Sequence, residues 1–165
     1  MYIDLIACLA PLATLTVAAF VAVMHFRQAK TAREKLRLDL YNKRFAIYES
    51  ALNFYQQLEG YELSEKKAFS SVHRAFIKCM RESKFLFDRQ SGIYEILEKM
   101  HMDSVRVTSF RDLAEEYSRM DEPAQRLKIA GFQKEMIDVL MSFPARIENL
   151  EAKIAKYLDF HKIVA

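Results

Sequence analysis

The chain begins with a long uncharged stretch, and beyond it apolar positions recur three and four residues apart. From Leu5 to Met24, 20 consecutive residues carry no charged side chain. At about 1.5 Å per residue, a helix of that length measures about 30 Å, which is the thickness of a bilayer's hydrocarbon core. The pattern therefore predicts a transmembrane helix here. A buried helix of a soluble protein is the alternative that the length disfavours.

Two apolar stripes follow the helical period after this stretch, and no Pro or Gly interrupts residues 26–58. The first stripe consists of Leu38, Tyr41, Phe45, Tyr48, Leu52 and Tyr55. The second consists of Leu40, Ile47, Ala51, Phe54 and Leu58. Adjacent stripes indicate a wide buried face rather than a coiled-coil seam. We expect the first helix to enter a folded domain and to end near Gly60.

Later restarts of the same period predict further helices. One begins with Ser64 as its N-cap and ends around Phe87-Asp88, and another begins at Asp121-Glu122-Pro123. Ser142-Phe143-Pro144 separates the last two helices. The inward positions, helix by helix, are Phe69, Val72, Phe76 and Met80; Ile96, Met100, Val107, Phe110, Ala114 and Tyr117; Ile129, Phe132, Met136, Val139 and Phe143; and Ile147, Leu150, Ile154, Tyr157 and Leu158.

The composition agrees with these helices, because three Gly and three Pro are too few for the turns of a sheet protein. The predicted fold is all-α: one N-terminal transmembrane helix continuous with a cytoplasmic antiparallel bundle of four to five helices. The predicted segments are a short outer tail and transmembrane helix (1–26), a juxtamembrane helix entering the bundle (27–59) and the remainder of the bundle (60–165).

Positive charge concentrates just after the predicted span. Seven of the 25 basic residues form what we call the basic collar: Arg27, Lys30, Arg33, Lys35, Arg37, Lys43 and Arg44. The other flank has Asp4 and no basic side chain, so the N-terminus is expected outside and the domain in the cytoplasm. After Phe45, 18 basic residues face 19 acidic ones. The collar is therefore expected to contact anionic lipid headgroups, and no direct nucleic-acid readout is expected.

A cleaved signal peptide fits the apolar stretch less well than a retained signal-anchor. Signal peptides carry positive charge before the apolar run and small residues at the cleavage site. No Lys or Arg precedes Leu5, and His25-Phe26-Arg27-Gln28 follows the run. We expect a single-pass protein that keeps this helix.

The histidines offer little sign of a metal site or a catalytic triad. Glu98 and His101 have the Glu-x-x-His spacing of di-iron centres, but those need a second copy and two more inward Glu. The sequence has no second copy, so a solvent-exposed helix face is the favoured interpretation. His73 and His161 have no partner at ligand or triad spacing. We expect each to lie at the surface or at an interface.

The remaining residues also point away from catalysis. Gly60, Gly92 and Gly131 are isolated, so no loop is predicted to bind a phosphate. Cys8 and Cys79 lie too far apart in this scheme to pair, and a cytoplasmic domain would keep Cys79 reduced. We predict no catalytic residue, cofactor or metal. An enzyme built from scattered residues is the alternative left open.

Two faces of the first helix are candidates for protein contacts. Small residues at every fourth position let transmembrane helices approach closely, and the span has such a membrane-packing face: Ala10, Thr14, Ala18 and Ala22. An aromatic stripe is a candidate partner surface, with the bundle core as its alternative role: Tyr41, Phe45, Tyr48 and Tyr55. Homo-oligomers are one possible outcome of either face.

Three landmarks in the sequence carry a family resemblance. They are Lys35–Glu49 (KLRLDLYNKRFAIYE), Lys84–Asp88 (KFLFD) with Ile93–Leu97 (IYEIL), and Lys156–Phe160 (KYLDF). In this order after one N-terminal span, they resemble a widespread, largely uncharacterised group of bacterial single-span membrane proteins with a cytoplasmic helical domain. The resemblance covers most of the chain. It implies a bacterial inner-membrane location and carries no catalytic residues with it.

Some proteins of this kind resemble the toxic transmembrane effectors of phage-defence operons, including retrons. This implies a non-enzymatic membrane effector that a cytoplasmic protein or nucleoprotein regulator restrains, and that perturbs the inner membrane once released. A membrane tether or scaffold that recruits a cytoplasmic protein partner is the second hypothesis.

Overall fold

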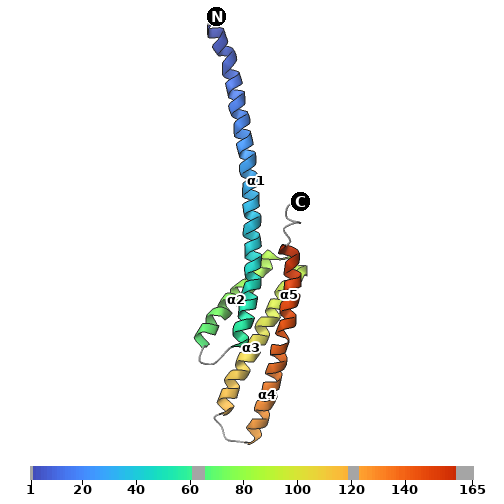
Figure 1. Cartoon of the computed structure of the whole chain (residues 1–165). Coiled ribbons are helices and arrows are strands. Elements are labelled where there is room, and N and C mark those ends of the chain that lie inside the picture. The colour runs from blue at the N-terminus through green and yellow to red at the C-terminus, as the bar shows by residue number, and fades with distance from the viewer. Residues whose placement is uncertain (1, 61–65, 119–122, 159–165) are drawn as a thin grey trace. The chain divides into compact units, whose positions relative to one another are not determined.

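The computed structural model of the chain is all-helical in the parts it describes (Figure 1). These parts are residues 2–60, 66–118 and 123–158, with side chains for 15–60, 67–115 and 129–158. The elements are α1 (Tyr2–Glu59), α2 (Lys66–Leu86), the 3-10 turn η2 (Arg89–Ser91), α3 (Ile93–Ser118), α4 (Pro123–Met141) and α5 (Phe143–Leu158). The predicted all-α class is confirmed. The predicted helix starts at Ser64 and at Asp121-Glu122 lie outside the described residues.

The chain divides into two units, residues 1–40 and residues 41–165, and the division falls within α1. In the first unit, every side chain from Leu15 to Leu40 is exposed. The predicted span starts at Leu5, so its first half lies outside the described side chains. Across the described residues, none of the helices offers a stretch that is both long and apolar enough to cross a bilayer.

The core of the second unit is built on one of the two predicted stripes of α1. Ile47, Ala51, Phe54 and Leu58 are buried, whereas Leu40 of the same stripe lies in the first unit and is exposed. The other stripe is half-buried or exposed. The packing partners of the core come from every later helix: Phe69, Phe76, Met80, Phe87, Ile93, Leu97, Met100, Val107, Phe143, Ile147, Leu150 and Ile154, with Met136, Val139 and Leu140 of α4 partly buried against them.

Contacts between helices of the second unit run in opposite chain directions. Along α1 and α5, Arg44 meets Tyr157 and Tyr48 meets Glu151. Further along, the rings of Tyr55 and Phe143 stack at 5.8 Å. Because the residue numbers in these contacts decrease along α5 as they increase along α1, the two helices are antiparallel. The same reversal relates α2 to α3, where His73 meets His101 and Lys84 meets Tyr94.

Two short breaks join the helices. Gly92 has φ +70°, a left-handed conformation that an L side chain rarely adopts, and it turns the chain from η2 into α3. The break between α4 and α5 falls at Ser142, within the predicted Ser142-Phe143-Pro144. Pro144 then occupies the first turn of α5, where its missing N–H costs no helical hydrogen bond.

The inward face of α3 differs in part from the prediction. Met100 and Val107 are buried as expected, but Ile96 is only half-buried. The buried positions also include Asp103 and Ser104, which a search for periodic apolar residues does not find because both are polar. Tyr117 lies outside the described side chains.

Candidate functional site

Arg44 makes several contacts at the point where α1 enters the second unit. Its Nε donates to the carbonyl oxygen of Leu86 at 3.0 Å, and one terminal nitrogen lies 3.5 Å from the carbonyl oxygen of Tyr157. Its guanidinium carbon lies 5.8 Å from the ring centre of Phe87 and 5.1 Å from that of Tyr157. The last turns of α2 and α5 leave carbonyls without helical partners, and Arg44 satisfies two of them.

The three sequence landmarks meet around this side chain. Arg44 belongs to the first, Phe87 and Asp88 to the second, and Tyr157 to the third. Phe87 and Tyr157 pack edge to face at 5.2 Å, and the Tyr157 hydroxyl lies 3.2 Å from a carboxylate oxygen of Asp88. We call this cluster the Arg44 junction. Each landmark thus supplies one part of the same contact.

This placement changes the interpretation of the basic collar. Arg27, Lys30, Arg33, Lys35 and Arg37 are all exposed within the first unit. Lys43 belongs to the second unit and borders a hollow of about 450 Å³ that also includes the free thiol of Cys79. Arg44 is half-buried, and its hydrogen bonds go to carbonyls. Arg44 therefore differs from the five exposed collar residues, because its donors are engaged inside the folded unit, and lipid contact by the collar stays a prediction.

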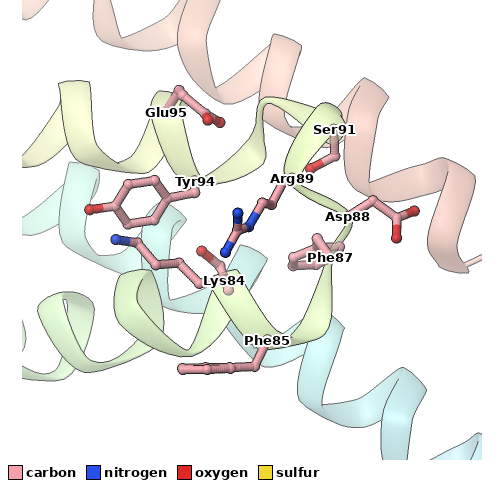
Figure 2. A pocket seen from close by; sticks show the side chains of 9 residues that line it. Lys84, Phe85, Phe87, Asp88, Arg89, Ser91, Tyr94 and Glu95 are labelled. Atoms are coloured by element: carbon pink, nitrogen blue, oxygen red, sulfur yellow. The ribbon is translucent and has the colours of Figure 1, made fainter.

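A hollow of about 500 Å³ lies at the connection between α2 and α3 (Figure 2). Figure 2 shows the side chains of Lys84 and Arg89 directed toward Tyr94. The Lys84 ammonium lies 3.8 Å from the centre of that ring, and the Tyr94 hydroxyl donates to Glu98 at 2.8 Å. Asp88 and Glu95 balance the two cations. The lining thus combines charged side chains with the Tyr94 ring and the rings of Phe85 and Phe87.

A shallower apolar groove lies beside the aromatic stripe of α1. It has a volume of about 330 Å³ and is lined by Phe45, Tyr48, Glu151, Ile154, Ala155 and Leu158. The rings of Tyr41 and Phe45 stack at 6.2 Å, and Phe45 remains 36% exposed. Tyr55, the fourth predicted member of the partner surface, instead packs on Phe143. The structure thus brings Tyr41, Phe45 and Tyr48 together on one surface.

Burial and a nearby carboxylate alter the pKa of Tyr48, which lines this groove. The hydroxyl oxygen of Tyr48 lies 3.5 Å from a carboxylate oxygen of Glu151. Partial burial, and then the negative charge of Glu151, raise the pKa of Tyr48 above its ordinary value. The phenol therefore stays protonated and remains a hydrogen-bond donor at neutral pH.

A histidine pair joins α2 to α3, and it gives His73 a partner that its spacing along the sequence did not indicate. Nε2 of His73 lies 3.0 Å from Nδ1 of His101, and both rings are half-buried. Burial, followed by the nearby His101, lowers the pKa of His73. Of the two positions expected for His73, the surface and an interface, the structure shows a half-buried contact between two helices. Glu98 is exposed as predicted, but His101 of the same Glu-x-x-His spacing points to this pair. The two histidines lie 28 positions apart, so no local motif could have revealed them.

Asp103 is a buried charge of the second unit, and sequence reasoning missed it. Its carboxylate pairs with Arg146 of α5, and it lies 3.3 Å from the Lys99 ammonium and 3.7 Å from a guanidinium nitrogen of Arg106. Its Oδ1 has no aligned hydrogen bond, so the cations hold it mainly by charge. The cluster joins α3 to α5 through a carboxylate that is almost fully enclosed, which makes it structural.

The remaining predicted positions fall mostly in the first unit. Ala18 and Ala22 of the membrane-packing face are exposed, and Ala10 and Thr14 lie outside the described side chains. Within the described part of the chain, no group of three His, Cys, Asp or Glu side chains could bind a metal ion. Comparisons with protein-family models, with curated proteins and with solved structures found no match to this chain.

Proposed function

We propose that this chain is a non-enzymatic effector that α1 anchors in a bacterial inner membrane and that a cytoplasmic partner restrains. Support comes first from the surface of the first unit. Its apolar side chains have no cover within that unit: Leu15 is 72% exposed, Val17 63% and Phe20 67%. Exposed apolar side chains in such a run need lipid or another protein around them. Five exposed cations follow in the same unit, and such clusters of basic residues next to a span bind anionic headgroups.

Release of the partner is the proposed trigger. The spans would then associate through the small residues at Ala18 and Ala22 and perturb the bilayer. The second unit supplies the surface that the partner holds, with no chemistry assigned to it. The resemblance of the three landmarks to single-span bacterial proteins motivates the toxic outcome. A regulator of protein or nucleoprotein type fits this scheme.

A membrane tether is the second candidate function. The observation that favours it is the groove that offers the exposed ring of Phe45 beside the half-buried ring of Tyr48 on a folded unit. A partner could dock there without any change in the membrane. Both functions share the anchor and differ in what the anchored chain does to the bilayer.

The anchor is tested with a charged variant and a matched apolar control. Arg at Leu15 and Val17 should disfavour insertion by about 5–7 kcal/mol in total, at about 2.5–3.5 kcal/mol for each Arg near the helix centre. We expect the L15R/V17R chain to leave the membrane fraction after an alkaline wash, while L15I/V17I stays. Retention of the Arg variant, or loss of the unmodified chain, would contradict the anchor.

The effector is tested separately by expressing the unmodified chain in a bacterium while membrane potential and growth are followed. A fall in potential that L15R/V17R abolishes is the expected result. Unchanged potential and growth at high expression would remove the effector function and leave the tether. Undiminished self-association of A18L/A22L would remove the packing face from the proposal.

A further inference from the structure

The His73–His101 pair sits where three helices meet. The His73 ring stacks on Phe54 of α1 at 5.2 Å and lies 5.6 Å from the ring of Phe69 on α2. Its partner His101 comes from α3, with ring centres 5.1 Å apart. The pair is thus a polar contact within an aromatic layer between α2 and the rest of the second unit.

This contact requires that one of the two facing ring nitrogens carries no proton. A hydrogen bond between two imidazoles needs an N–H on one ring and a lone pair on the other. The contact at 3.0 Å can therefore form when both rings are neutral or when one is charged. When both are protonated, two donors face each other and the positive charges repel.

Four charged groups on the surrounding elements have contacts away from the two imidazoles. On α1, Glu59 interacts with Tyr55. On α2, the Nε of Arg74 donates to the carbonyl of Ser70 at 3.3 Å. On α3, Glu98 accepts from Tyr94, and Lys99 pairs with Asp103. None of these contacts places a carboxylate against either imidazole, so a second positive charge would find no counter-ion among these groups.

We propose that the His73–His101 contact is a proton-sensitive latch, which holds α2 against α3 until both rings are protonated. The inference does not depend on the proposed function. Burial lowers the pKa of His73 below its ordinary value of 6.5, which favours the neutral ring in the folded chain. A lowered histidine pKa contributes stability that is complete above pH 6.5 and is lost as the pH falls below it.

Opening of the latch would uncover the aromatic layer. Phe54 and Phe76 stack face to face at 4.1 Å with an interplanar angle of 1°, and both are buried. These rings belong to α1 and α2, so separation of α2 exposes both. The latch therefore controls access to a large aromatic surface of the second unit.

The test uses the full chain and follows amide hydrogen exchange from about pH 7.5 to about pH 5, corrected for the intrinsic rate. Protection of α2 should fall by up to about tenfold per pH unit below about 6.5, the limit for one linked proton. His73→Phe keeps a stacking ring without a titrating nitrogen and should abolish this dependence. His25→Gln, at an exposed histidine in the first unit, should leave it unchanged.

A second measurement keeps the inference falsifiable if His73→Phe does not fold. Titration of the ring nitrogens of the unmodified chain by NMR should place the pKa of His73 below its ordinary value of 6.5. A pKa of His73 at or above 6.5 would overturn the latch. Retention of the full pH dependence by a folded His73→Phe chain would overturn it as well.

Discussion

Phe20 and Phe54 are the same side chain on the same helix, yet Phe20 is 67% exposed and Phe54 is fully buried. The contrast extends to their neighbours. Every described side chain of α1 up to Leu40 is exposed, whereas Ile47, Ala51 and Leu58 are buried under later helices. Both parts of α1 are rich in apolar residues. Apolar composition therefore indicates that these side chains favour contact with other apolar groups. It does not indicate which groups cover them, because that depends on the helices packed against α1.

The largest effect expected on stability follows from this contrast. Phe54→Ala removes a ring that packs on Phe76 and Phe69, and it should lower the free energy of unfolding by about 3–5 kcal/mol. Phe20→Ala removes the same atoms from an exposed position and should change that free energy by less than about 0.5 kcal/mol. Urea unfolding of the two variants, followed by circular dichroism, measures both values. Equal losses would break the comparison.

A buried charge should behave like a buried ring, with a smaller effect. Asp103→Asn removes the negative charge from between Arg146, Lys99 and Arg106, and it should lower the free energy of unfolding by about 1.5–3 kcal/mol. Asp39 is exposed on α1, so Asp39→Asn serves as the matched control. If Asp39→Asn were the more damaging variant, the ion cluster would not be holding α3 to α5.

The smallest expected effect separates Arg44 from the rest of the basic collar. Arg44→Lys keeps the charge but loses the planar donor that reaches Leu86 while lying over Tyr157, at a cost of about 1 kcal/mol. Arg37→Lys, at an exposed site, should leave the unfolding midpoint where it was. Identical midpoints for the two variants would show that Arg44 contributes no more to stability than an exposed residue of the basic collar.

Much of the helical framework could be predicted from the sequence, because apolar period and helix breakers act locally. The end of α1 near Gly60 and the break at Ser142 are of this kind. The site residues depend on packing between distant segments. His73 and His101 are 28 residues apart, and Arg44 and Tyr157 are 113 apart. Arg44 was grouped with the basic collar on charge alone, because the sequence does not show which side chains donate to a carbonyl.

The separation between Arg44 and Tyr157 in the sequence also determines how long their contact must wait during translation. The ribosome adds about 5–20 residues per second, so the carbonyl of Tyr157 is made about 6–23 s after Arg44. The contact of Phe54 with Phe76 can close early in that interval, but the side of α1 that meets α5 stays uncovered until Phe143 and the residues after it emerge. Nascent chains that end before Phe143 should therefore require a chaperone, and longer ones should lose that need as α5 is completed.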